Sequence, residues 1–136
     1  MLLRGSLLTI AMLGMLGGVA AANPNSPNAN ADCFGDHDVT KVVAHHKTIP
    51  SGQGSYQKLA GARAYVAAKP GLTGEWLHAQ LEQRTSAPQQ GTECPLDVPG
   101  VSISVRSAGP GFWVALSAND SQDAKEVLRR TQTLTR

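Results

Sequence analysis

The stretch VSISVRSAGPGFWVALS, residues 101–117, constrains the fold more strongly than any other part of the sequence. Residues 101–106 alternate strictly between apolar and polar side chains, which is typical of a strand with one buried face. The segment 107–111, SAGPG, has the glycine and proline content of a turn, and residues 112–117 predict the returning strand. We expect the inward-facing side chains to be Val101, Ile103, Val105, Phe112, Val114 and Leu116. The sequence therefore predicts a β-hairpin with one apolar face.

Two segments that flank this hairpin have the apolar periodicity of amphipathic helices. Residues 72–84, LTGEWLHAQLEQR, predict a helix that Thr73 caps, and Asp120 predicts the cap of a second helix after the hairpin. On the first helix the predicted apolar side consists of Leu72, Trp76, Leu77 and Leu81, and the opposite side of Glu75, His78 and Glu82. On the second helix the predicted apolar side consists of Ala124, Val127, Leu128, Thr131 and Leu134.

The segment that precedes the first helix has weaker patterns. Residues 63–68 predict a strand, residues 56–61 a single helical turn, residues 51–55 a loop, and residues 39–44 a short strand. Since two apolar helix faces need a sheet to cover, the fold class is α+β, a two-layer sandwich. From residue 63 onward the order is β-α-β-β-α, which resembles part of a ferredoxin-like domain. The short N-terminal strand at 39–44 could take the place of the missing last strand.

The start of the chain has the layout of a secretory signal peptide. One charged residue, Arg4, precedes an apolar run at 7–19 and the small residues at 20–22. A membrane anchor is the alternative, but the run is shorter than the roughly 20 residues that span a bilayer. We expect cleavage after Ala22, with a second site ending at Ala31 as the alternative. The protein is thus predicted to be periplasmic or secreted.

The rest of the chain predicts a disordered leader and one domain. Residues 23–31 are rich in asparagine and proline, and residues 32–136 have the usual length of a single domain. No further apolar segment predicts a membrane span in the mature chain. The whole chain carries 12 Lys and Arg against 10 Asp and Glu. Because the sequence shows no basic run longer than Arg129–Arg130, nucleic acid is not predicted as a partner.

Cys33 and Cys94 are the two cysteines of the chain. Their spacing does not fit a CxxC redox pair or a zinc knuckle. In an exported protein, two cysteines most often form a disulfide. Metal ligation by reduced thiols and two unpaired cysteines are the alternatives that the sequence leaves open.

Histidines offer a possible metal site. His37, His45 and His46 lie close together in the sequence, and His78 lies in the first predicted helix. Imidazole suits copper or zinc, but adjacent residues of a strand point to opposite faces. The fold would have to bring these side chains to another ligand. Whether the protein is an enzyme stays open, and catalysis is not favoured because no serine lies in a G-x-S-x-G motif.

Trp113 is the candidate contact for a partner. It alternates with Phe112 and Val114, so it points to the sheet face opposite the apolar one. Arg106, on the other strand of the hairpin, could stack on its ring. An exposed tryptophan is a plausible anchor in an interface, and coverage by the N-terminal segment is the alternative.

Three segments, TGEWL (73–77), ECPLDVPG (93–100) and GFWVALSANDSQDAKEVLRR (111–130), resemble those of small exported bacterial proteins of uncharacterised function. The predicted fold is also similar to heavy-metal-associated domains, whose metal-binding CxxC this sequence lacks. We therefore predict a non-catalytic exported protein that binds a ligand or an envelope protein partner. The alternative is a copper-binding or zinc-binding accessory protein that uses the N-terminal histidines.

Overall fold

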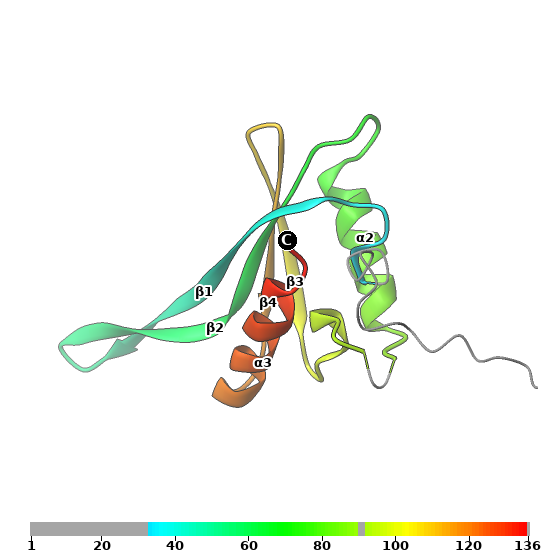
Figure 1. Ribbon diagram of the computed structural model, residues 1–136. Helices are drawn as coiled ribbons and strands as arrows, with labels where there is room; N and C mark the ends of the chain where they lie inside the picture. Colours follow the sequence, from blue (N-terminus) through cyan, green and yellow to red (C-terminus); the bar gives the residue numbers. More distant parts are fainter. Residues whose placement is uncertain (1–32, 90–91, 136) are drawn as a thin grey trace, which may run out of the picture.

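The computed structural model describes residues 33–89 and 92–135, so the predicted signal peptide, its cleavage sites and the leader lie outside the described residues. Four strands form one antiparallel sheet in the order β1-β2-β4-β3 (Figure 1). The α+β class is confirmed. The elements, in chain order, are β1 (Val39–Ser51), β2 (Gly54–Val66), α2 (Gly74–Thr85), the short 3-10 helix η1 (Pro95–Asp97), β3 (Ser102–Ala108), β4 (Gly111–Ser117) and α3 (Ser121–Gln132).

The core lies between one face of the sheet and the two long helices. The predicted inward face of the β3–β4 hairpin is confirmed, because Phe112, Val114 and Leu116 are buried and Ile103 and Val105 pack against the core. Helix α3 packs mainly on β2, and α2 packs on β3. The buried side chains of α3 and of the residues after it are Ala124, Val127, Thr131 and Leu134, as the sequence predicts. Among the described residues, no helix covers the second face of the sheet.

Both predicted helix caps are present. The side-chain oxygen of Thr73 accepts a hydrogen bond from the amide of Trp76, and that of Asp120 accepts one from the amide of Asp123. These bonds satisfy amides of the first turn, which have no partner within the helix. Helix α2 therefore begins at Gly74, and α3 begins at Ser121.

The predicted apolar side of α2 is confirmed except at Trp76, and Leu72, just before the helix, packs against the core. Leu77 and Leu81 are buried, but Trp76 is 60% exposed. Gly74 lies on the same stripe as the two leucines and faces Phe112 and Val105 of the hairpin. Since neighbouring residues differ by about 100° around a helix, this orientation turns Trp76 away from the core.

The N-terminal half forms a long β-hairpin where the sequence predicted a turn of helix. Residues 56–61 belong to β2, and β1 continues past residue 44 to Ser51. β1 and β2 pair as far as Ser51 and Gly54, whereas β2 pairs with β4 only from Gly61 onward. Residues 46–59 therefore extend beyond the four-stranded sheet as a two-stranded ribbon (Figure 1).

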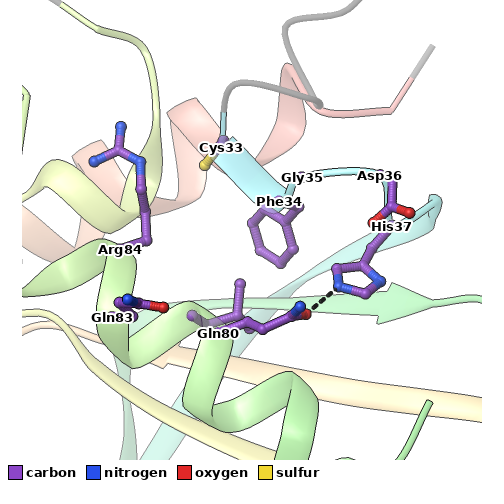
Figure 2. Close-up of a pocket in the computed structure, with 9 residues that line it drawn as sticks. Cys33, Phe34, Gly35, Asp36, His37, Gln80, Gln83 and Arg84 are labelled. Carbon is purple, nitrogen blue, oxygen red and sulfur yellow. Dashed lines mark hydrogen bonds between the residues drawn. The ribbon is translucent and has the colours of Figure 1, made fainter. Parts of the chain in front are cut away.

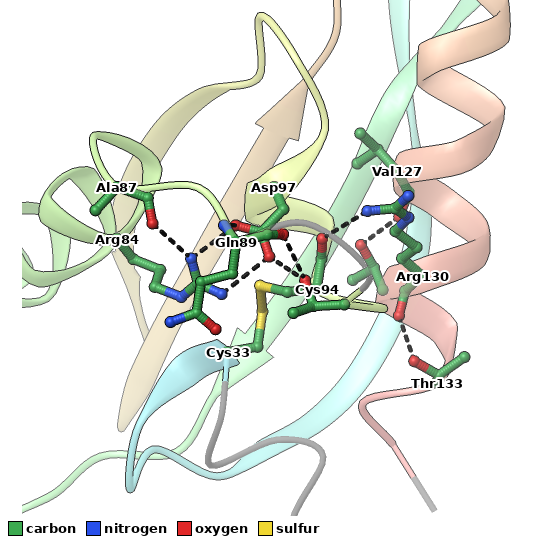
Figure 3. Close-up of a disulfide and its surroundings, with 11 residues drawn as sticks. Cys33, Arg84, Ala87, Gln89, Cys94, Asp97, Val127, Arg130 and Thr133 are labelled. Atoms are coloured by element: carbon green, nitrogen blue, oxygen red, sulfur yellow. Dashed lines mark hydrogen bonds and ion pairs between the residues drawn. A yellow bond between two sulfur atoms is a disulfide. The ribbon is translucent and has the colours of Figure 1, made fainter. Parts of the chain in front are cut away.

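The predicted disulfide is present. Cys33 and Cys94 are bonded, their Cα atoms are 5.3 Å apart, and both are buried (Figure 3). The bond joins the turn before β1 to the segment before η1. Arg130 of α3 donates a hydrogen bond to the carbonyl oxygen of Cys94 at 3.2 Å. The disulfide and this hydrogen bond thus connect the start of the described chain to both η1 and α3.

An ion pair beside the disulfide fixes the end of α2. Arg84 donates two hydrogen bonds to the carboxylate of Asp97, at 2.7 and 2.9 Å (Figure 3). Burial by itself would raise the pKa of Asp97, but hydrogen bonds from Thr92, Arg84 and the amide of Gln89 hold that pKa below its ordinary value. Because Arg84 and Asp97 share two hydrogen bonds and both side chains are mostly buried, their ion pair holds the loop after α2 against η1.

Candidate functional site

The uncovered face of the sheet, which we call the open face, carries the candidate site. Three cross-strand rows of side chains lie on it, set by the strand register. One row contains Lys41, Tyr65, Trp113 and Arg106; the next contains Val43, Arg63, Ala115 and Ser104; the third contains His45, Gly61, Ser117 and Ser102. The open face therefore combines cations, two aromatic rings and hydroxyl groups from all four strands.

Trp113 is at the centre of the open face. The guanidinium carbon of Arg63 lies 4.7 Å from the centre of its ring, and the ring of Tyr65 meets it edge-on at 5.1 Å. The Tyr65 hydroxyl donates a hydrogen bond to the carbonyl oxygen of Ala108 at 2.8 Å, which fixes that ring. Arg106 lies directly across from Trp113 in the β3–β4 register, as expected, but the guanidinium over the ring is that of Arg63. Trp113 is half-buried, so it is a preorganised platform.

A hollow of about 420 Å³ surrounds Trp113. Its volume lies within the usual range for sites that bind small molecules, about 300–1,000 Å³. Every residue that lines it belongs to one of the four strands. These residues are Ala44, His45, His46, Arg63, Ser104, Arg106, Trp113, Ala115 and Ser117.

Charge is sharply segregated between the sheet and the rest of the chain. The four described strands contain no Asp or Glu residue, and they carry Lys41, Lys47, Lys58, Arg63 and Arg106. The chain as a whole is nearly balanced in charge, but the Lys and Arg residues of its sheet are not balanced by any carboxylate in the strands. Such a surface attracts anions over several ångströms.

The strand cations differ in their partners from every other described Lys and Arg residue except Lys125. Within residues 33–89 and 92–135, no ion pair involves any of the five Lys and Arg residues of the strands. Outside the strands, Lys69, Arg84, Arg129 and Arg130 each pair with a carboxylate. Lys47 even stands directly opposite Lys58 in the ribbon, where like charges repel. The protein thus leaves the cations of its sheet available to an external anion.

His45 adds a titratable group to the hollow. Burial lowers its pKa below the ordinary value, and the positive charges of Arg63 and Lys47 and the neighbouring His46 lower it further. His45 is therefore neutral at neutral pH and gains a proton only in more acidic solution. An anion bound in the hollow would oppose this effect and favour the protonated ring.

The three histidines of the predicted metal site are not gathered together. His37 is buried, its Nε2 lies 2.6 Å from the side-chain oxygen of Gln80, and it lines a separate cavity of about 310 Å³ (Figure 2). His45 and His46 both line the hollow around Trp113, because a register shift interrupts the strand between them. In the described part of the chain, no three His, Cys, Asp or Glu residues form a group that could hold a metal ion. The copper or zinc site stays a prediction, and His78 instead contacts Glu82 and the carbonyl oxygen of Ile103.

Comparison with models of protein families, with curated proteins and with solved structures found no match to this chain. Across residues 33–89 and 92–135, no helix is long and apolar enough to cross a membrane.

Proposed function

We propose that the protein is a non-catalytic binding protein that uses the open face of its sheet to hold a negatively charged ligand or partner. The segregation of charge supports this most strongly, because the open face contains Lys41, Arg63 and Arg106 and no carboxylate, and none of these three cations forms an ion pair among the described residues. Arginine, tryptophan and tyrosine are also the residues most enriched at the energetic centres of interfaces. The open face presents all three at Arg63, Trp113 and Tyr65.

The protein is proposed to act outside the cytoplasm, as a periplasmic or secreted domain. The disulfide between Cys33 and Cys94 supports this, since disulfides persist in oxidising compartments. Nucleic acid was not predicted as a partner because the sequence has no basic run. Strand pairing nevertheless brings Lys41, Arg63 and Arg106 to one face of the sheet, so the binding test includes a nucleic-acid probe.

The fold is proposed to be a ferredoxin-like arrangement in which β1 replaces the last strand. Supporting this, β4 lies between β2 and β3, and β1 lies on the other side of β2. This arrangement would account for the open face, because both helices then cover the same side of the sheet.

Binding of polyanions tests the proposed function. The probes are poly-L-glutamate, heparin and single-stranded DNA, followed by calorimetry at several salt concentrations. We expect poly-L-glutamate to bind with an affinity that falls as salt rises, because opposite charges at an exposed surface are screened. Replacing Lys41, Arg63 and Arg106, the cations that the strand register places on the open face, together with glutamine should weaken this binding by at least about tenfold.

The matched control is Lys125→Gln, which removes an exposed cation from α3 on the other side of the sheet. It should change the affinity less than twofold. Absence of binding to all three probes, or an equal effect of the control and one sheet variant such as Lys41→Gln, would refute the proposed function. Preference for heparin or for DNA would identify a different kind of anionic partner.

A further inference from the structure

Two arginines of the open face converge on the same hollow from different strands. Arg63 comes from β2 and Arg106 from β3, and both line the hollow around Trp113. Because β4 lies between these strands, their backbones are about 10 Å apart. Both side chains are long enough to reach over β4. Neither takes part in an ion pair within the described residues.

We infer that the hollow is a carboxylate-binding site in which Arg63 and Arg106 hold the ligand's carboxylate and Trp113 forms the floor. The inference rests on the proposed function and narrows it to one chemical group. The carboxylate could belong to a small organic acid or to an acidic side chain of a partner protein.

The position of Arg63 favours binding with little loss of side-chain freedom. Its guanidinium is held 4.7 Å from the centre of the Trp113 ring, and Tyr65 supports the ring from its edge. Part of the entropy cost of ordering an arginine is therefore met before the ligand arrives. A guanidinium stacked on a ring keeps its N–H donors at the rim, where a carboxylate can accept two of them.

The hollow lacks the backbone donors that phosphate sites commonly use. Phosphate sites commonly use backbone N–H groups from helix N-termini or from nests of successive amides. The residues that line this hollow all lie in strands, and β4 is paired along both of its edges. Its side-chain donors are the guanidinium groups of Arg63 and Arg106, the ring N–H groups of His45, His46 and Trp113, and the hydroxyls of Ser104 and Ser117. Each guanidinium can donate two parallel hydrogen bonds to a carboxylate.

His45 should make this site sensitive to pH. The charged and titratable groups around it are Arg63 on β2, His46 and Lys47 on its own strand, and Arg106 across the hollow on β3. Burial lowers the pKa of His45 most, and the charges of Arg63, Lys47 and His46 lower it further, so its protonation is disfavoured in the ligand-free protein. A bound carboxylate offsets their charge, so binding should be coupled to uptake of a proton.

Intrinsic fluorescence can test the site directly. The chain has two tryptophans, and Trp76 is 60% exposed, so Trp76→Phe leaves Trp113 as the single reporter. The probes are N-acetylglutamate and inorganic phosphate at matched ionic strength. We expect N-acetylglutamate to change the emission of Trp113 in a saturable way. Arg63→Gln and Arg106→Gln should each weaken binding by at least about tenfold, and Lys125→Gln by less than twofold.

Further variants separate charge from shape. Arg63→Lys keeps the charge but loses the planar fork, so it should bind more weakly than the parent protein and more tightly than Arg63→Gln. Between about pH 7.5 and about pH 5.5 the affinity should increase, because the carboxylates of the probe stay ionised while His45 gains a proton. His45→Gln should remove most of that increase. Far-ultraviolet circular dichroism of each variant controls for misfolding.

Two outcomes would overturn the inference. Phosphate binding as tightly as N-acetylglutamate, with the same dependence on both arginines, would exclude selectivity for carboxylate. N-acetylglutamate affinity that is unchanged in the Arg63→Gln and Arg106→Gln double variant would exclude the site. If poly-L-glutamate still bound through Lys41 of the open face in that double variant, the proposed function would stand without this site.

Discussion

Replacing Gly61 with alanine is expected to destabilise the domain by more than about 3 kcal/mol and to prevent folding if the native stability is low. A Cβ atom at this position would lie 1.9 Å from the carbonyl oxygen of Leu116 and 3.0 Å from its carbonyl carbon. Both are backbone atoms of β4, which is paired on each side and cannot move away easily. The φ angle of Gly61, 156°, is also one that other residues rarely adopt.

The measurement is equilibrium unfolding in urea, followed by far-ultraviolet circular dichroism. Gly54→Ala is the matched control, because no atom lies within 4 Å of a Cβ added at Gly54, at the start of β2. It should change the free energy of unfolding by less than about 1 kcal/mol. A Gly61→Ala variant as stable as this control would show that β2 and β4 do not approach as described.

Loss of the disulfide should have an effect of similar size. The Cys33→Ala and Cys94→Ala double variant is expected to lose about 4 kcal/mol of stability, because the cysteines are 61 residues apart and their bond restricts a long loop in the unfolded chain. The measurement is again urea unfolding at neutral pH. Wild-type protein unfolded with and without reductant gives the effect of the bond without the small cavities that alanine leaves at two buried positions.

The two comparisons should agree within about 1 kcal/mol, with the remaining difference coming from the lost sulfur atoms. Equal stability of oxidised and reduced wild-type protein would contradict the structural role of the bond. Arg63→Gln and the disulfide variant should also affect different properties. Arg63→Gln should weaken ligand binding, whereas the disulfide variant should lower stability. The disulfide variant should bind N-acetylglutamate normally while folded, because Cys33 and Cys94 do not line the hollow around Trp113.

Local patterns predicted the C-terminal half well. The strict alternation at 101–106, the turn at 107–111 and the caps Thr73 and Asp120 each depend on neighbours in sequence, and the structure has all of these features. The strand predicted at 63–68 contains the C-terminal end of β2, but residues 54–62 were missed because they alternate poorly and contain glycine and alanine, which favour no strand. The conformation of β2 comes from pairing with β1 and β4, which is a long-range effect.

The candidate site was predicted only in part. Trp113 and Arg106 could be assigned to one face because they belong to the same hairpin. Arg63 and Tyr65 reach Trp113 only through the pairing of β2 with β4, and no local spacing shows that contact. One feature of the sequence does indicate a basic sheet: residues 39–66 and 102–117 lack any Asp or Glu. Counting charge by predicted strand and not by run would have indicated a basic face.

Mapping a bound acidic peptide by nuclear magnetic resonance tests most directly whether the open face is the binding surface. Amide and side-chain signals of the isotope-labelled protein would be followed during titration with hexaglutamate. We predict saturable shifts that cluster on Lys41, His45, Arg63 and Arg106 and on the indole N–H of Trp113. Shifts confined to α2 and α3, or no saturable shift on the four strands, would contradict the assignment of the open face as the site of anion binding.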